Sequence, residues 1–385
     1  MSLSNSSNDC FWHLPMEMRA NILSYLTYDS LLNAIHASQA LHAPFMPEEL
    51  EGEICRSLLR RNIDENFLPL AIALYIAECE SRKNVFPKCD TNPKYLYTEM
   101  VVTFCEKHLK DPRVNSLDPT EVRGEMTVRM LKFYQIAQDV AGLIAVQVGK
   151  GLPQLRRPNE WSRMVKCAYI YELATIIVGP KVPRRDEENL KAWRSFWRCF
   201  APWEVAGIPI LETCIRSEMH LKGIDSIDRH PRDRTSPLSL RRFHYVPFGS
   251  SSPFRSHIEW YDTFSLSNAL HLDKLLWFPS GIFDGRLGMK AILDVTQRYQ
   301  GEEHAGPRDL FLWAHLINGL RRNSPLSGMT VGWGTVFNVS GSIMFGHPHM
   351  GRYCFQDRYT LERAHAGRYP TMEAMVAEAE AIIGQ

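Results

Sequence analysis

The spacing of apolar residues near the start of this 385-residue chain constrains its fold more than any other feature. Pro15 suits the first turn of a helix, because the N–H that proline lacks would be unpaired there in any case. Met18, Ile22 and Leu26 then recur at four-residue steps, with Leu23 beside them. This period predicts a helix with one apolar side.

Two more short helices are predicted before Pro44. Asp29 is a suitable N-cap for a helix that carries Leu31 and Leu32, and Ser38 can cap a third helix. Three helices of this size cannot bury all their apolar surface among themselves, because about 40 residues is near the lower limit for an independent fold. We therefore expect part of this surface to meet another surface.

The order of residues in this stretch resembles an F-box, the helical module that binds the Skp adaptor of cullin–RING ubiquitin ligases. Its Leu-Pro, Ile-Leu-x-x-Leu, Leu-Leu and Ala-Ser elements all fall in register between residues 14 and 38. One departure is that the aromatic residue often found after the serine in this family is Leu41 here. The residues that this resemblance marks as adaptor-binding or core-forming, without dividing the two roles, are Leu14, Pro15, Ile22, Leu23, Leu26, Leu31 and Leu32. The alternative is that the stretch is only a helical cap on a larger domain.

A second resemblance lies far downstream, at the Phe-Ala-Pro-Trp-Glu segment of residues 200–204. Four aromatic residues at three- and four-residue steps lead into it and predict one buried helix face: Trp193, Phe196, Trp197 and Phe200. The combination is similar to a filamentous-fungal family of F-box-like proteins, in which a Phe-x-Pro-Trp-Glu segment follows the helical region. Residues 207–209, Gly-Ile-Pro, depart from that family, because they should break a helix that it usually continues.

Helical periodicity in much of the remaining sequence predicts a mainly α fold. We expect a small three-helix F-box-like module, residues 11–50, packed on a larger helical domain, residues 51–385. At most a small β-hairpin is predicted near the C-terminus, where residues 331–337 are β-branched and aromatic between glycines. Residues 228–253 read as a long, polar, mobile connection. Its arginines, within residues 229–242, would suit an acidic or phosphorylated peptide, although a solvated loop is the simpler interpretation.

Composition excludes several classes of partner. Lysine plus arginine number 44 and aspartate plus glutamate 43, so nothing global indicates nucleic acid or a membrane surface. No apolar run approaches the roughly 20 residues needed to span a bilayer. Residues 1–8 lack the basic and apolar regions of a signal peptide. The nine cysteines are scattered, which favours a reducing compartment, cytoplasm or nucleus, and no disulfide framework.

Motifs for catalysis are absent from the sequence. There is no phosphate-binding glycine loop, no Gly-x-Ser-x-Gly elbow and no His-Glu-x-x-His. The best metal candidate is the pair His347 and His349, with Cys354, Asp357 and His365 downstream. The proline between the two histidines more often marks a turn. We therefore predict no enzyme, no cofactor and no metal.

The resemblance implies a substrate receptor that binds a Skp-family adaptor of a cullin–RING ligase and recruits an unknown protein for ubiquitination. The main rival is an interaction or structural protein whose F-box-like helices belong to its own core. In that case Leu14, Ile22 and Leu26 would be covered by residues 51–110. A metal-dependent enzyme built on His347 and His349 is the second rival.

Overall fold

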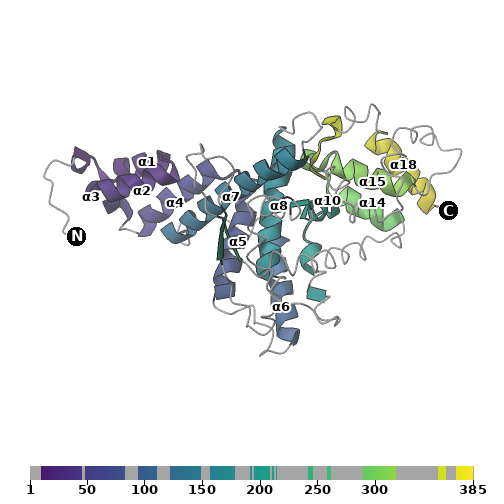
Figure 1. Cartoon of the computed structure of the whole chain (residues 1–385), viewed down its shortest axis with the longest axis horizontal. Helices are drawn as coiled ribbons and strands as arrows, with labels where there is room; N and C mark the ends of the chain where they lie inside the picture. Colours follow the sequence, from purple (N-terminus) through teal and green to yellow (C-terminus); the bar gives the residue numbers. More distant parts are fainter. Residues whose placement is uncertain are drawn as a thin grey trace. The chain divides into compact units, whose positions relative to one another are not determined.

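The structure is a computed structural model in which two compact units make up the chain. The first unit lies within residues 1–83 and 104–136, and the second within residues 84–103 and 137–385. Figure 1 labels the main helices and colours them by their place in the sequence. The structure describes residues 10–45, 48–82, 94–110, 122–148, 157–177, 191–192, 195–208, 210–211, 214, 242–245, 258–261, 289–317, 354–360 and 370–384.

The described part of the chain is mainly α-helical, which confirms the predicted fold class. The elements up to residue 109 are η1 (Cys10–His13), α1 (Met16–Tyr25), α2 (Tyr28–Ala37), α3 (Gln39–His42), η2 (Ala43–Phe45), α4 (Glu48–Asn62), α5 (Leu68–Arg82), α6 (Lys94–Phe104) and the π-helical turn η3 (Cys105–Leu109). Those that follow are α7 (Gly124–Val148), α8 (Pro158–Ile177), α10 (Pro202–Ala206), β1 (Arg242–Tyr245), β2 (Ile258–Tyr261), α14 (Met289–Arg298), η6 (Glu302–His304), α15 (Pro307–Ile317) and α18 (Met372–Ile383).

One of the three predicted N-terminal helices begins as its sequence signal indicates: the Ser38 side chain caps α3 by accepting a hydrogen bond from the Leu41 backbone N–H at 3.2 Å. Pro15, predicted in the first turn of α1, is its N-cap and lies one residue before that turn. The predicted cap of α2 is wrong. Thr27, which has extended backbone geometry, accepts from the Ser30 N–H with its hydroxyl, so α2 begins early enough to place Asp29 inside its first turn.

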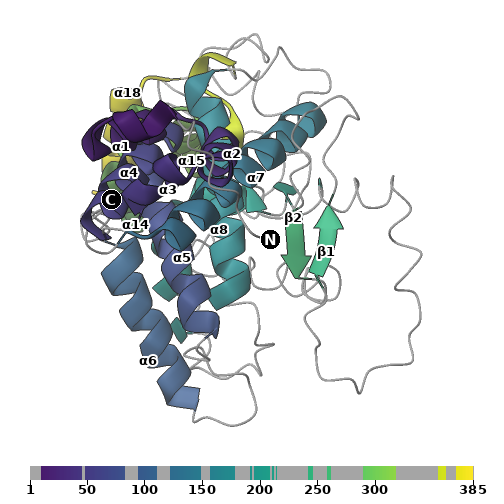
Figure 2. The ribbon, with the colours of Figure 1, turned by 90° about the vertical axis from the view of Figure 1, so that its left-hand side faces the viewer.

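The N-terminal helices share a core with α4. Its buried members are Ala20, Leu23, Leu31, Leu41, Ile54 and Leu58. Ile54 and Leu58 belong to α4, which begins before the predicted module boundary at residue 50 and ends after it. That boundary therefore lies inside a compact unit. Figure 2 looks onto this group of helices.

The described strands form a two-stranded antiparallel ribbon. Arg242 of β1 pairs with Tyr261 of β2, and Tyr245 pairs with Ile258 (Figure 2). β1 lies within residues 228–253, so the prediction of an irregular connection is wrong for these four residues. Their composition, with two aromatics in four positions, suits a strand once a partner is available. The predicted hairpin at residues 331–337 lies outside the described residues.

The aromatic face predicted before residue 200 forms part of the core of the second unit. Phe196, Trp197 and Phe200 are buried, whereas Trp193 lies outside the described residues. Helical geometry ends at Trp197, so Phe200 lies in the turn that follows and not on the predicted helix face.

α10 ends at Ala206 with Gly207 as its C-cap, but Gly207 keeps right-handed helical backbone geometry and Ile208 is helical again. The Leu211 N–H donates to the Gly207 carbonyl at 3.0 Å, so the predicted helix break is limited to a turn at Gly207. A Cβ on Gly207 would lie only 2.9 Å from a ring carbon of Phe355, so glycine also permits close packing there. In the part of the chain that the structure describes, no helix has the length and apolarity to cross a membrane.

Candidate functional site

Exposed apolar side chains gather on the side of α1 that faces away from its core. Met18, Ile22 and Tyr25 share this side because they are four and three residues apart. Met18 is 53% exposed and Tyr25 is 65% exposed, whereas Ile22 is half-buried. Pro15 at the start of α1 is exposed, and Trp12 in η1 is 53% exposed. We call these five residues the α1 surface.

Each aromatic residue of the α1 surface lies against an arginine. The Arg19 guanidinium carbon is 5.1 Å from the centre of the Trp12 ring, and that of Arg61 is 4.9 Å from the centre of the Tyr25 ring. Both arginines also donate to backbone carbonyls, Arg19 to Ala40 at 2.7 Å and Arg61 to Tyr25 at 2.8 Å. The two rings are therefore held in place although they are exposed.

The structure divides the predicted site residues by their burial. Leu23 and Leu31 are core residues, with exposed fractions of 0% and 5%. Pro15 is exposed, while Leu14, Ile22 and Leu26 are half-buried, and Leu26 packs against the core cluster. Leu32 lies in α2, but its side chain is outside the description.

Sequence reasoning missed the most exposed members of the α1 surface. The apolar period of α1 includes Met18, but the F-box resemblance does not mark Met18 as a site residue. It marks neither Trp12 nor Tyr25. The spacing of Met18, Ile22 and Tyr25 is the signal that could have found two of them, because it continues one helix face toward the end of α1. Trp12 lies before the helix, where helical periodicity carries no information.

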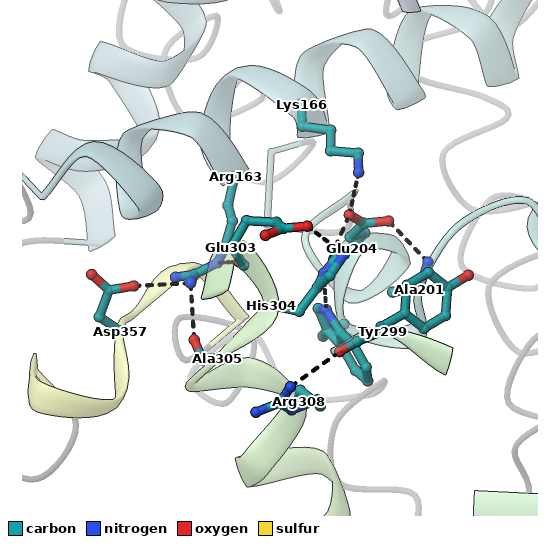
Figure 3. A network of polar contacts seen from close by, with 11 residues as sticks. Arg163, Lys166, Ala201, Glu204, Tyr299, Glu303, His304, Ala305, Arg308 and Asp357 are labelled. Atoms are coloured by element: carbon teal, nitrogen blue, oxygen red, sulfur yellow. Dashed lines mark hydrogen bonds and ion pairs between the residues drawn. The ribbon is translucent and has the colours of Figure 1, made fainter. Parts of the chain in front are cut away.

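A second constellation, buried and polar, lies in the second unit (Figure 3). Arg163 of α8 donates to the backbone carbonyls of Glu303, Ala305 and Phe355 at 2.7, 2.9 and 3.0 Å. It also pairs with the Asp357 carboxylate at 2.9 Å. Burial lowers the pKa of Arg163, and Asp357 opposes that effect. One side chain thus ties two distant segments of the chain to α8.

Glu160, one turn before Arg163 on α8, strengthens the same connection. Its Oε1 accepts the backbone N–H of Asp357 at 2.9 Å. Its other oxygen, Oε2, is buried and has no hydrogen-bond partner among the described residues. Gln356 is 0% exposed, and within the described ranges neither atom of its side-chain amide has a partner.

Glu204, the acid of the Pro-Trp-Glu segment, is a charged group inside the second unit. Its side chain is 7% exposed, and it pairs with the Lys166 ammonium at 2.5 Å. It also accepts the Ala201 N–H at 2.9 Å, across the start of α10. Burial alone would raise the pKa of Glu204, but Lys166 and the hydrogen bonds lower it overall. Glu204 is therefore an ionised structural group at neutral pH.

His304 is held beside Glu204 in its neutral form. The Trp203 indole N–H donates to Nδ1 of His304 at 3.2 Å, so Nδ1 carries no proton. Although Glu204 lies 3.8 Å from the same nitrogen, burial lowers the pKa of His304 and outweighs this attraction. The Trp203 and Tyr299 rings enclose the imidazole, with centroids 5.7 and 5.0 Å away. The arrangement fixes the ring in the core.

The described cysteines are free thiols. Burial raises the pKa of Cys55 to about 11 and raises those of Cys167 and Cys354 further above the usual range. These three thiols therefore stay protonated at neutral pH, and a protonated thiol is a weak nucleophile and a weak metal ligand.

Only some of the residues considered as metal ligands from the sequence lie within the described residues. Cys354 is buried and Asp357 is paired with Arg163, whereas His347, His349 and His365 lie outside the description. Within the described ranges, no group of three or more histidine, cysteine, aspartate or glutamate side chains is placed to hold a metal ion.

Comparisons with protein-family models, with curated proteins and with solved structures found no match to this chain. The α1 surface and the buried network therefore have to be interpreted from their own chemistry.

Proposed function

We propose that this chain is an F-box-type adaptor, whose α1 surface binds a Skp-family adaptor of a cullin–RING ubiquitin ligase. The second unit then holds a protein substrate, and other subunits transfer ubiquitin. One observation carries the proposal, namely that Trp12, Met18 and Tyr25 stay exposed although Leu23, Leu31, Ile54 and Leu58 are buried in the core of the same unit. In this role the chain itself catalyses no reaction. We propose that it acts in the cytoplasm or nucleus.

The exposed side chains are of the kinds that anchor protein interfaces. Tryptophan, tyrosine and methionine are enriched in the buried centres of interfaces, and aromatic residues there carry much of the binding free energy. An aromatic side chain removes about 150–250 Å² from water when it is buried. The stability of the folded module does not require this burial, because Leu23 and Leu31 already close the core with Ile54 and Leu58.

A second candidate function is an interaction or structural protein whose F-box-like helices serve its own fold. The observation that favours it is the core shared with α4, together with the half-buried positions of Leu14, Ile22 and Leu26. This candidate gives no reason for Met18 and Tyr25 to be exposed. The two candidates therefore differ in what they expect of the α1 surface.

Co-purification with a Skp-family adaptor tests the proposal. The variant Met18→Ser/Tyr25→Ser removes two exposed side chains of α1 without touching the core, so its thermal unfolding should match that of the wild type. We expect its adaptor affinity to fall by at least about tenfold, because interface anchors contribute about 1–2 kcal/mol or more each.

Val146→Ser is the matched control, since Val146 is 64% exposed on α7 and lies outside the α1 surface. It should bind the adaptor as the wild type does. If the folded wild-type protein does not bind the adaptor, the ligase function is wrong and the second candidate takes its place.

A further inference from the structure

Arg61 of α4 contacts Tyr25 through both the ring and the backbone of that residue. We propose that Arg61 is a positioning residue of the α1 surface, which holds Tyr25 in the orientation that the Skp-family adaptor binds. This inference rests on the proposed function and adds a residue that lies outside the F-box-like stretch of residues 11–50.

The contacts of Arg61 fix two different parts of Tyr25. Its guanidinium carbon lies 4.9 Å from the centre of the ring, and its Nη1 donates to the Tyr25 carbonyl at 2.8 Å. Tyr25 is the last residue of α1, where carbonyls have no partner within the helix. A cation at this end is also favourable for the helix dipole. Arg61 therefore caps the C-terminal end of α1 and also orients the ring of Tyr25.

This arrangement matters for binding because an exposed side chain normally loses freedom when a partner covers it. Ordering one such side chain costs about 0.5–1.5 kcal/mol. Tyr25 is 65% exposed, yet its ring already rests on Arg61. Part of the ordering therefore takes place before the adaptor arrives, and the ring is presented in one orientation.

The opposite end of the α1 surface has the same construction. The guanidinium of Arg19 lies over Trp12 and is held by the Ala40 carbonyl at 2.7 Å. Each exposed aromatic residue of the α1 surface thus has its own arginine, which is itself anchored to the backbone. Arg19 is only 6% exposed, so substituting it would disturb the fold, whereas Arg61 is exposed and can be tested directly.

A double-mutant cycle measured by titration calorimetry with a purified Skp-family adaptor tests the role of Arg61. Arg61→Ala should weaken binding about 3- to 10-fold, in line with one exposed cation–π contact and one hydrogen bond. Arg61→Lys should recover only part of the affinity, because lysine keeps the charge but not the planar guanidinium. In the Tyr25→Ala background, Arg61→Ala should change the affinity less than about twofold.

Arg60→Ala is the matched control, since Arg60 is the preceding exposed arginine on α4 and points to a different side of the helix. It should bind the adaptor as the wild type does. Equal losses from Arg61→Ala with and without the Tyr25 ring would overturn the proposal, because they would show that Arg61 acts through general stability.

Hydrogen exchange separates failure of this inference from failure of the proposed function. Arg61→Ala should speed amide exchange in residues 22–25, the last turn of α1, whereas Arg60→Ala should not. Unchanged exchange in Arg61→Ala overturns the positioning role even if the wild type binds the adaptor. If Arg61→Ala shows the exchange effect but the wild-type protein does not bind the adaptor, the proposed function is wrong, and with it the role of Arg61 in docking.

Discussion

The two units of the chain use apolar and charged side chains in opposite ways. In the first unit, Met18 and Tyr25 are exposed on a helix whose other side contributes Leu23 to the core. In the second unit, the charged groups of Arg163 and Glu204 are buried and paired. The free energy falls when a partner covers exposed apolar groups. Buried charges, in contrast, destabilise the folded state unless each of them is paired. We therefore expect substitutions on the α1 surface to change binding and substitutions in the buried network to change folding.

The buried network has an evident structural task. The carbonyls that Arg163 satisfies lie in segments 140 to 192 residues further along the chain. A buried backbone carbonyl without a partner is destabilising, so irregular segments need donors from elsewhere in the fold. A single guanidinium supplies them here, which makes the network sensitive to the loss of one residue.

The largest effect is expected from Arg163→Met, which removes that guanidinium. The Asp357 carboxylate, whose side chain is 13% exposed, would then lose the cation that lies 2.9 Å away. Breaking a buried ion pair by removing one partner costs about 3–5 kcal/mol. Urea denaturation should show a loss of this size in the free energy of unfolding.

Arg298→Met, which changes an exposed arginine in the last turn of α14, is the control for this prediction. It should alter the free energy of unfolding by less than about 0.5 kcal/mol. A loss below about 1 kcal/mol for Arg163→Met would contradict the structural role of the network and break the comparison between the two units.

The next largest effect distinguishes two residues on opposite sides of α1, Leu23 and Met18. Leu23→Ala should destabilise the protein by about 2–5 kcal/mol, because Leu23 is 0% exposed in the core. Met18→Ala should change stability by less than about 0.5 kcal/mol but should weaken adaptor binding. Thermal unfolding and calorimetry on the same preparations would measure both. Similar destabilisation by the two substitutions would show that the α1 surface belongs to the fold.

Much of the fold could be predicted because helical periodicity is local. α1 follows Pro15 and α3 is capped by Ser38, as the local signals before Pro44 indicate. The α2 cap could not be predicted, because Thr27 and Asp29 are both good caps and the backbone decides between them. β1 escaped prediction for a different reason: a four-residue strand depends on its partner β2, which local composition does not identify.

The candidate sites, too, depend on contacts between distant parts of the chain that local sequence does not reveal. The Pro-Trp-Glu segment is visible in the sequence, but the partners of Glu204 and Trp203 are not, since Lys166 and His304 lie 38 residues before Glu204 and 101 residues after Trp203. The α1 surface could be predicted only in part. Periodicity indicates an apolar side of α1, but only the position of α4 decides that Leu23 faces inward and Met18 outward.

A smaller effect, opposite in sign, is expected at Gln356. This side chain is 0% exposed, and within the described part of the chain its amide has no hydrogen-bond partner. An unsatisfied buried polar group costs about 1–3 kcal/mol, so Gln356→Met should raise the free energy of unfolding by about 1 kcal/mol. Gln356→Ala is the control, because it removes the same amide but leaves a cavity and should not stabilise. Destabilisation by Gln356→Met would show that the amide has an unrecognised partner.

The smallest effect is expected in the pH dependence of stability, and it depends on His304. Burial lowers the pKa of His304 below 6.5, so the unfolded chain binds more protons than the folded protein as the pH falls below that value. The contribution of His304 is therefore complete above about pH 6.5 and is lost progressively below it. The pKa of Glu204 is lowered below 4.5, so its own contribution is lost only at more acidic pH. His304→Gln keeps an acceptor for the Trp203 N–H and should flatten the fall in unfolding free energy between about pH 7 and 5, measured by urea denaturation. An unchanged slope in that range would mean that His304 takes up a proton as readily in the folded protein as in the unfolded chain, which is incompatible with its position beneath Trp203.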